Sequence, residues 1–179
     1  MVLHRCNAVC EFNHYAVCCD VSEVVIGTDG VCEDFIPRKI MEFQGDYRFL
    51  SNFYPCEVAH DHMVFPSAEH AYQAAKCDRP GDRLAIQQLD TPGQAKRFGR
   101  KVSMRRHWEH DKLQVMFQIV MSKFIMNPGI RRELLDLRGY ILIEGNRWGD
   151  EFWGVCLETE RGKNHLGKIL MQVRDLLAK

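Results

Sequence analysis

Residues 113–124 read Leu-Gln-Val-Met-Phe-Gln-Ile-Val-Met-Ser-Lys-Phe, and this segment decides the class of fold. Its large apolar residues recur three, four, seven, eight and eleven positions after the first, which is the spacing of one face of an α helix. These residues are Leu113, Met116, Phe117, Val120, Met121 and Phe124. The pattern predicts a long amphipathic helix that packs against a core, so its methionines need no functional explanation.

Further helices are predicted on both sides of this one. Pro and Ser at the start of residues 66–76 are typical of a helix N-terminus. Residues 91–99 begin with Thr-Pro-Gly-Gln, the pattern of a capping box with Pro at the first helical position, and they end in Gly. Asn-Pro opens another helix over residues 127–139. A final helix is indicated by apolar residues at helical spacing, namely Leu166, Ile169, Leu170, Val173 and Leu177.

Only short segments favour strands. Residues 40–43 and 47–50 read as two strands around Gly45, residues 63–65 as the return strand of a hairpin, and residues 140–143 as one more strand. Helices followed or interrupted by a few strands predict an α+β fold. We therefore expect one compact, mainly helical α+β domain over residues 38–179.

The composition is that of a soluble globular protein. The chain of 179 residues is 46% hydrophobic and 27% charged, and it is long enough for one domain with a full core. Its apolar runs are far shorter than the roughly 20 residues that cross a membrane, and no secretion signal is evident. We expect a cytoplasmic protein with no membrane partner.

Residues 1–37 differ from the rest as an acidic, cysteine-rich extension of unknown role. Free thiols are the default in a chain without a signal peptide. The even spacing of Cys6, Cys10, His14 and Cys18 is a poor match to the Cys-x2–4-Cys pairs of structural zinc sites, so we expect no metal. Residues 15–18 and 24–26 favour short strands instead, with a turn at residues 27–30. The remainder of the chain is mildly basic, which suits a phosphorylated small molecule or a short nucleic acid.

The tryptophan loop, residues 146–154, reads Asn-Arg-Trp-Gly-Asp-Glu-Phe-Trp-Gly and contains two of the three tryptophans. It favours neither helix nor strand. Indole faces on which a ring can stack, glycines that allow close approach and the charge of Asp150 suit the wall of a pocket. The alternative is a tryptophan-rich core loop.

The predicted helix at residues 66–76 carries a polar face made of Glu69, Tyr72, Gln73 and Lys76. This face is either solvated or lines a site. The helix dipole favours the charged form of Glu69 by about 0.3–1 kcal/mol, whereas burial raises the pKa of such a group. His70 points about 100° away around the helix, so we do not interpret Glu69 and His70 as a dyad.

Five motifs in order carry a family resemblance. They are Phe49-Leu-Ser-Asn-Phe-Tyr-Pro55, Phe65-Pro-Ser-Ala-Glu-His-Ala-Tyr-Gln-Ala-Ala-Lys76, Thr91-Pro-Gly-Gln-Ala-Lys-Arg97, Trp148-Gly-Asp-Glu-Phe-Trp-Gly154 and Gly162-Lys-Asn-His-Leu-Gly-Lys-Ile-Leu-Met171. Together they resemble the YbiA-like family, also called NADAR domains, over about residues 41–178. Residues 1–37 lie outside the resemblance.

The resemblance implies an N-glycosidase. Some members of the family hydrolyse ribosylaminopyrimidine phosphates of the riboflavin pathway and release ribose 5-phosphate, whereas others remove ADP-ribose from guanine in nucleic acid. Both reactions cut a ribose C1–N bond. A third hypothesis is a module that binds ADP-ribose or a nucleotide without turnover. The two carboxylates of the motifs argue against it.

The resemblance implies a catalytic role for Glu69, and we assign Asp150 as the second acid. Cleavage of a ribosyl C–N bond passes through an oxocarbenium-like state that a carboxylate stabilises, so no metal or other cofactor is required. The departing base needs a stacking surface, for which the candidates are Phe53, Trp148 and Trp153. The other expected substrate contacts are Asn52 and Asn164 for hydroxyls or base edges, Tyr72 and Gly154 in the pocket wall, and Lys76, Lys96, Arg97 and Arg100 for phosphate.

Overall fold

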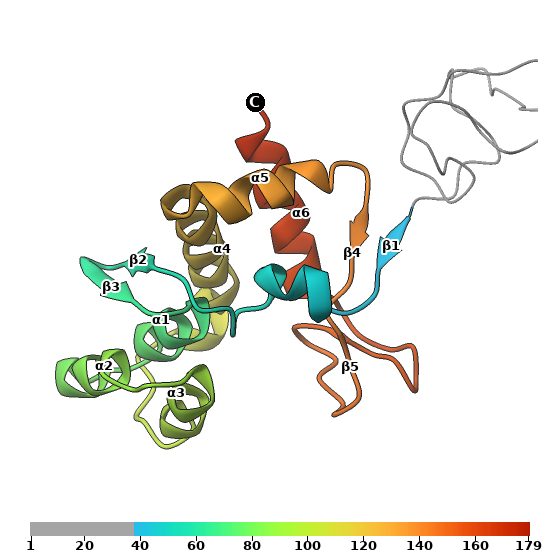
Figure 1. The fold of residues 1–179 in the computed structure, drawn as a ribbon. Coiled ribbons are helices and arrows are strands. Elements are labelled where there is room, and N and C mark those ends of the chain that lie inside the picture. Colours follow the sequence, from blue (N-terminus) through green and yellow to red (C-terminus); the bar gives the residue numbers. More distant parts are fainter. Residues whose placement is uncertain (1–37) are drawn as a thin grey trace, which may run out of the picture.

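The computed structural model describes residues 38–179, which form a mainly helical α+β domain (Figure 1). The helices are α1 (Ala68–Ala75), α2 (Pro80–Gln87), α3 (Pro92–Gly99), α4 (Trp108–Met126), α5 (Pro128–Asp136) and α6 (His165–Leu177), and the 3₁₀ helix η1 (Gly45–Leu50) precedes them. The strands are β1 (Lys39–Ile40), β2 (Val58–His60), β3 (Met63–Phe65), β4 (Ile141–Leu142), β5 (Gly145–Asn146) and β6 (Val155–Cys156). The predicted fold class is confirmed.

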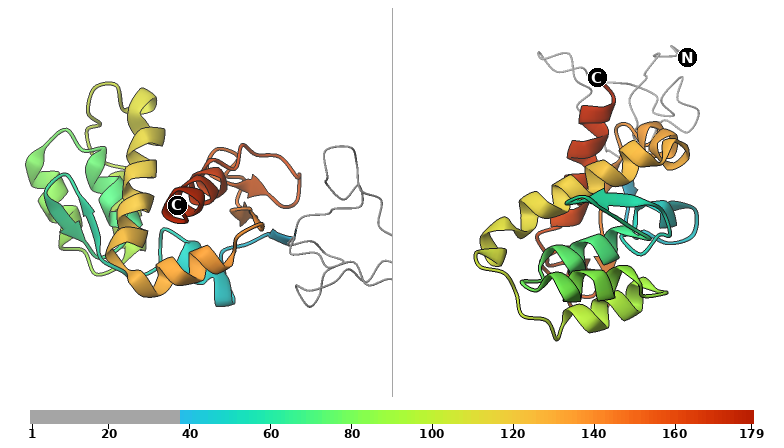
Figure 2. Two further views of the ribbon diagram at one scale, coloured as in Figure 1. Left: turned by 90° about the horizontal axis from the view of Figure 1, so that it is seen from above. Right: turned by 90° about the vertical axis from the view of Figure 1, so that its left-hand side faces the viewer.

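Helix α4 is the centre of the domain. It packs against α1 and β2 on one side and against α6 on another (Figure 2). Met116, Val120 and Phe124 of the predicted stripe are buried, which confirms the core role of this helix. Leu113 is 37% exposed, however, while Val115 and Ile119 are buried in its place. A helix with neighbours on two sides buries a wider and rotated arc, so a single stripe describes it incompletely.

Local signals located the other predicted helices well. Ser67 caps α1, and Thr91 forms the expected capping box with Gln94 at the start of α3. Helix α6 buries Leu166, Ile169, Leu170 and Val173, as its apolar spacing predicts. Helix α5 ends at Asp136, three residues before the predicted end. Helix α2 was not predicted, since it is short and contains Gly81.

The strands form three separate two-stranded sheets. The hairpin of β2 and β3 confirms the predicted return strand at residues 63–65. The strands of the parallel pair β1–β4 are far apart in sequence. Those of the parallel pair β5–β6 are separated by the tryptophan loop. The prediction of a strand at residues 47–50 is wrong. Gly45 has a positive φ of 53° and the chain turns there into η1, where Tyr47 N–H bonds to the carbonyl of Gln44 over 3.0 Å.

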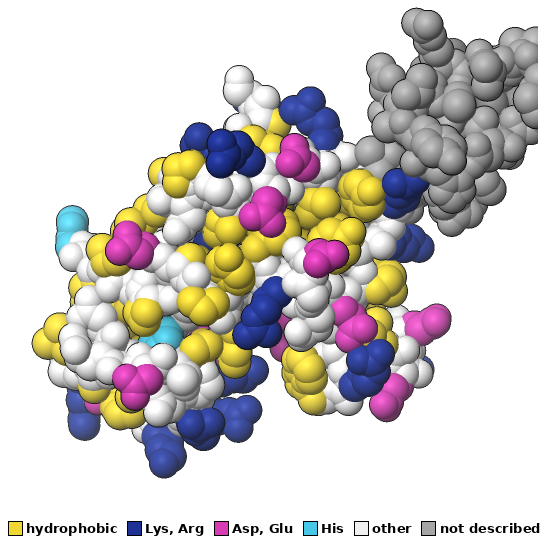
Figure 3. Space-filling model, in the orientation of Figure 1, with side chains coloured by type: hydrophobic (Ala, Val, Ile, Leu, Met, Phe, Trp, Pro, Cys, Tyr) yellow, Lys and Arg dark blue, Asp and Glu magenta, His cyan; other side chains and the backbone are white. Residues whose placement is uncertain are grey.

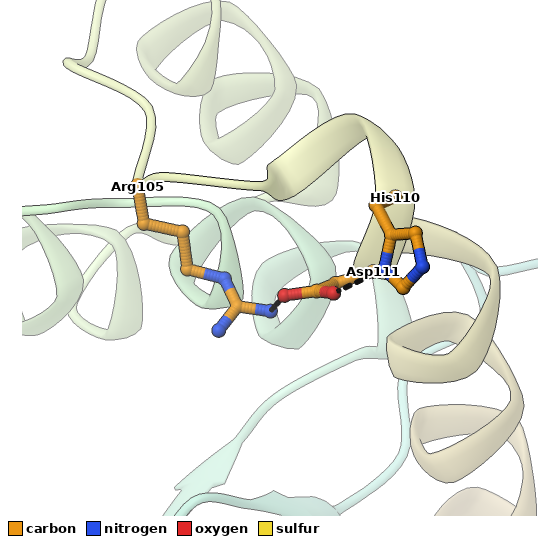
Figure 4. A network of polar contacts seen from close by, with 3 residues as sticks. All are labelled: Arg105, His110 and Asp111. Atoms are coloured by element: carbon orange, nitrogen blue, oxygen red, sulfur yellow. Dashed lines mark hydrogen bonds and ion pairs between the residues drawn. The ribbon is translucent and has the colours of Figure 1, made fainter.

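A polar network holds the entry to α4 (Figure 4). Nη2 of Arg105 donates to Oδ2 of Asp111 over 3.0 Å, and Nδ1 of His110 lies 3.0 Å from Oδ1 of the same carboxylate. The imidazole of His110 beside it lowers the pKa of Asp111. Because these residues flank the left-handed His107, the network supports the turn into the helix. The side chain of His110 is otherwise exposed to solvent.

Within residues 38–179, no helix combines the length and apolar character needed to span a membrane. Residues 1–37 lie outside the described residues. The expectations of two short strands, a turn and no metal there therefore stay predictions.

Candidate active site

A cleft of about 750 Å³ lies between the helices α1 and α3 and the tryptophan loop. Figure 3 shows a hollow between the lower left part of the molecule, which contains α2 and α3, and the lower right part. Lys and Arg side chains gather along the bottom of the lower left part. Ten of the thirteen residues predicted for the site line the cleft, namely Asn52, Phe53, Glu69, Tyr72, Lys96, Arg97, Arg100, Trp148, Asp150 and Trp153. The polar face of α1 therefore lines a site and is not simply solvated.

Glu69 stands in the first turn of α1 and is only 7% exposed. Its backbone N–H donates to the carbonyl oxygen of Asn52 over 2.9 Å, which ties the start of α1 to the preceding loop. Its Oε1 accepts a hydrogen bond of 2.8 Å from Nε2 of Gln73. Burial raises the pKa of Glu69, while Gln73 and the cations Lys96, Lys76 and Arg100 favour its charged form. A fixed carboxylate in such a setting is suited to stabilise developing positive charge.

His70 takes no part in the cleft, which confirms that it forms no dyad with Glu69. It is fully buried, with Nδ1 at 2.7 Å from Oγ of Ser67 and Nε2 at 3.0 Å from the carbonyl oxygen of Leu89. Both ring nitrogens are thus engaged in holding α1 against the neighbouring turn.

The loop that carries Asn52 and Phe53 is held from below by α4. Nζ of Lys123, a wholly buried side chain, donates to the carbonyl oxygen of Ser51 over 2.8 Å. Sδ of Met116 accepts from Nδ2 of Asn52 over 3.4 Å, and Met116 lines the cleft, so this methionine does have a place in the site. Oδ1 of Asn52 is buried and lacks a partner within residues 38–179. An acceptor left open in this way is suited to a ligand hydroxyl.

Helix α3 and the residue that caps its C-terminus bring three cations, Lys96, Arg97 and Arg100, to one wall of the cleft. Nζ of Lys96 lies 5.6 Å from the centre of the Phe53 ring, which places a cation over an aromatic face. Arg48 of η1 adds a fourth cation that sequence reasoning did not identify. Fork-shaped guanidinium groups and an ammonium on one wall are suited to bind phosphate.

Asp150 organises the tryptophan loop from within. Its Oδ1 accepts hydrogen bonds from the N–H groups of Phe152 and Trp153, over 3.0 and 2.9 Å. Asn146 holds the same loop, because its side chain bonds to both the N–H and the carbonyl of Asp150. Asp150 therefore lines the cleft with a carboxylate that also has a structural duty.

The two tryptophans of this loop have different surroundings. Trp148 lines the cleft and is 68% exposed, so its ring is free for stacking. Trp153 is partly buried, with its ring centre 5.4 Å from that of Tyr72 and 5.0 Å from that of Phe152, both edge-on. Trp108 is 5% exposed and packs on Tyr72, so it anchors α4.

Glu144 is a cleft residue that sequence reasoning missed. It is a single acid between two short strands, with no motif around it. Burial raises its pKa to about 7, and the nearby charge of Asp150 contributes to the rise. No local sequence pattern predicts such a group, because its raised pKa comes from burial and from the charge of other residues of the fold.

Three predicted site residues lie outside the cleft lining. Asn164 is buried, and its side chain bonds to the carbonyl of Leu142 over 2.9 Å and to the N–H of Glu144 over 3.0 Å. Gly154 packs so closely that a Cβ there would lie 2.1 Å from the carbonyl oxygen of Glu144. Lys76 ends α1, and its charge favours the ionised form of Glu69 from a distance. The structure thus gives Asn164 and Gly154 roles in holding the backbone, where we expected substrate contacts.

Residues 40–178 match the NADAR domain. This chain belongs to the NADAR family. The matched region contains the whole cleft and excludes the cysteine-rich extension, as the resemblance of the motifs implies. The NADAR fold is also found in the NMR structure of the Escherichia coli protein YbiA, with a TM-score of 0.70 and 32% identity over 78% of this chain and 83% of that one.

Several NADAR relatives have names that state an activity. A riboflavin biosynthesis protein of Vibrio vulnificus is 32% identical over 169 residues, which cover 93% of this chain but 43% of that protein. An N-glycosidase of Nostoc punctiforme is 37% identical over 72% of this chain and 85% of its own length. The N-glycosidase YbiA of Escherichia coli is 35% identical over 74% of this chain and 83% of its own length.

Proposed function

We propose that this NADAR protein is an N-glycosidase that hydrolyses the ribose C1–N bond of phosphorylated ribosylaminopyrimidines of the riboflavin pathway and releases ribose 5-phosphate. The relatives named N-glycosidase and riboflavin biosynthesis protein support this substrate class. The observation that carries the proposal is the buried, oriented carboxylate of Glu69 in the same cleft as the cations of α3.

The geometry suits each part of such a substrate. Lys96, Arg97 and Arg100 receive the 5′-phosphate. The carboxylate of Glu69 stabilises the oxocarbenium-like ribosyl and takes a proton from the attacking water. Trp148 offers an open face to the pyrimidine, and Asn52 offers an unpartnered oxygen to a hydroxyl.

Asp150 is the second carboxylate of the proposed site. Its Oδ1 keeps the tryptophan loop in place, and its negative charge adds to the stabilisation of a positively charged ribosyl group. We therefore assign it an electrostatic and positioning contribution.

A second candidate function is the removal of ADP-ribose from guanine in DNA or RNA. A neighbouring hollow of about 400 Å³ shares Arg97 and Arg100 with the main cleft. Two adjoining hollows with shared arginines suit a ligand that has two phosphates. The chemistry at Glu69 is the same for both substrates.

A product assay with two substrates tests both functions. One substrate is a ribosylaminopyrimidine 5′-phosphate, and the other is a guanine oligonucleotide that carries ADP-ribose. We expect ribose 5-phosphate from the first, a loss of most turnover in Glu69→Gln, and wild-type turnover in the matched control Glu133→Gln, whose carboxylate is exposed on α5. Free ADP-ribose from the second substrate alone would support the second candidate. Release of neither product would contradict both.

A further inference from the structure

Glu144 is a carboxyl of the cleft that the mechanism above leaves unused. Its backbone is held at both ends, since its N–H donates to Oδ1 of Asn164 over 3.0 Å and its carbonyl accepts from the N–H of Val155 over 2.9 Å. Its Oε2 is buried and has no hydrogen-bond partner in the described part of the chain. A buried polar atom without a partner calls for an explanation, and here the cleft beside it suggests a ligand.

Four charged groups act electrostatically on Glu144, each from a different part of the fold. Glu69 of α1 and Asp150 of the tryptophan loop are acids, whereas Lys123 of α4 and Lys96 of α3 are cations. Burial is the largest cause of the rise in the pKa of Glu144 to about 7, and Asp150 is the next. Near neutral pH a substantial fraction of the molecules therefore carries a proton on this carboxyl.

The surroundings of Glu69 favour its charged form, unlike those of Glu144. Its charged form accepts a hydrogen bond from Gln73 and is favoured by three cations, although it is more deeply buried. Oε2 of Glu144 receives no hydrogen bond within residues 38–179, and the largest electrostatic influence on this carboxyl is the negative charge of Asp150. Two carboxyls in one cleft with such different environments are suited to different roles, one as base and the other as acid.

We propose that Glu144 is the general acid of the site, the group that protonates the departing nitrogen. This inference rests on the proposed N-glycosidase function. As the ribose C1–N bond breaks, its electron pair goes to the nitrogen, which takes the proton of the Glu144 carboxyl. The oxygen of a water molecule forms the new bond to C1 and gives a proton to Glu69. Proton exchange with solvent then restores both groups.

Asp150 is less suited to donate this proton. Its Oδ1 accepts two backbone N–H bonds that shape the tryptophan loop, so that oxygen serves as an acceptor throughout. Oε2 of Glu144, in contrast, makes no hydrogen bond within residues 38–179 and so holds no part of the backbone in place. Asp150 acts as a positioning residue, and its charge keeps the proton on Glu144.

A comparison of two leaving groups tests the acid role. The amine substrate is the ribosylaminopyrimidine 5′-phosphate, and the second substrate is 4-nitrophenyl riboside 5-phosphate, whose leaving group departs without protonation. In Glu144→Gln we expect kcat for the amine substrate to fall about 10²–10⁴-fold, the usual contribution of general acid catalysis, and kcat for the nitrophenyl substrate to change less than 10-fold. In Glu69→Gln both should fall. Rates without enzyme are subtracted, and circular dichroism checks the fold of each variant.

The pH profile of the wild-type chain provides a test that needs no variant. For the amine substrate, kcat/KM should fall as the pH rises through about 7, because Glu144 loses its proton. The nitrophenyl substrate should show no such limb. Equal losses of both substrates in Glu144→Gln, or the same alkaline limb for both, would overturn the acid role. A wild-type chain that cleaves neither substrate would instead overturn the proposed function itself, and the acid role with it.

Discussion

Nε2 of Gln73 donates a 2.8 Å hydrogen bond to Oε1 of Glu69, one turn earlier on α1. The other end of the same amide, Oε1 of Gln73, is buried, has no hydrogen-bond partner among residues 38–179 and faces Gly99 of α3. The orientation of the proposed catalytic carboxylate therefore depends on a glycine of a different helix.

Gln73→Leu should move the acid limb of kcat/KM to higher pH. The hydrogen bond lowers the pKa of Glu69, so its loss raises that pKa, and Glu69 must be ionised to accept a proton. A hydrogen bond to a charged group contributes about 1.5–3 kcal/mol, so activity below the limb should fall about 10-fold or more. The matched control Gln114→Leu, at an exposed position of α4, should leave the profile in place. An unchanged limb in Gln73→Leu would show that this amide does not tune Glu69.

Gly99→Ala should reduce activity through Gln73. An added Cβ would lie 2.0 Å from Oε1 of Gln73 and 2.8 Å from its Cδ, so that side chain must move away from its place beside Glu69. We expect at least a 10-fold loss of kcat/KM with a modest loss of thermal stability. In Gly81→Ala the new methyl group meets nothing within 4 Å, so this control should keep its activity and gain stability from the better helix former. Equal activity of the two variants would contradict the prediction.

Trp148→Ala should weaken substrate binding without a change in melting temperature. The exposed indole has little packing to lose, and a stacked base contributes about 1–3 kcal/mol, or roughly 5–150-fold in Kd. Equilibrium binding of the ribosylaminopyrimidine phosphate to the Glu69→Gln background measures this. Trp153→Ala should lower the melting temperature instead, because its ring packs on Tyr72 and Phe152. If Trp148→Ala bound as tightly as its parent, the base would have to stack elsewhere.

Glu144→Gln should stabilise the protein at pH 8 but not at pH 4. The pKa of Glu144 is about 7 in the fold, against an ordinary value of 4.5, so ionisation costs stability increasingly between those values and the full cost applies above pH 7. We expect the variant to gain about 2 kcal/mol in the free energy of unfolding at pH 8, less than the full pKa difference because the side chain is only partly buried. Urea unfolding at both pH values measures it, with Glu133→Gln as the control. A gain of equal size at pH 4 would contradict the electrostatic origin.

The helices were predictable because their signals are local. Ser67, the capping box at Thr91 and the apolar spacing of α6 lie within the elements that they define. The segment at residues 47–50 misled the prediction, since its aromatic and apolar residues suit a strand as well as the buried face of η1. The pairing of β1 with β4 joins Lys39 to Ile141, and no local pattern encodes a contact over that distance.

The residues of the site also fall into those that local motifs predict and those that only tertiary contacts reveal. Family motifs located Glu69 and the cations of α3, and the structure brings them into one cleft. Glu144 escaped notice because its properties come from burial and from Asp150, not from its neighbours in sequence. Asn164 belongs to a family motif, but its side-chain amide bonds to the backbone of Leu142 and Glu144. A motif position therefore indicates proximity to the site, while the atoms that remain free for a ligand are decided by tertiary contacts.

Lys123 and Met116 belong to the central helix of the core, yet they hold the loop that carries Asn52, and the carbonyl of Asn52 in turn receives the N–H of Glu69. Because the floor of the cleft is bonded to the buried central helix, we expect its amide hydrogens to exchange only on nearly global unfolding. We therefore expect the proposed substrate to meet a cleft that is already ordered, so that binding costs little conformational entropy of the protein. The same connection means that repacking of the core around α4 should also alter the wall of the cleft that carries Glu69.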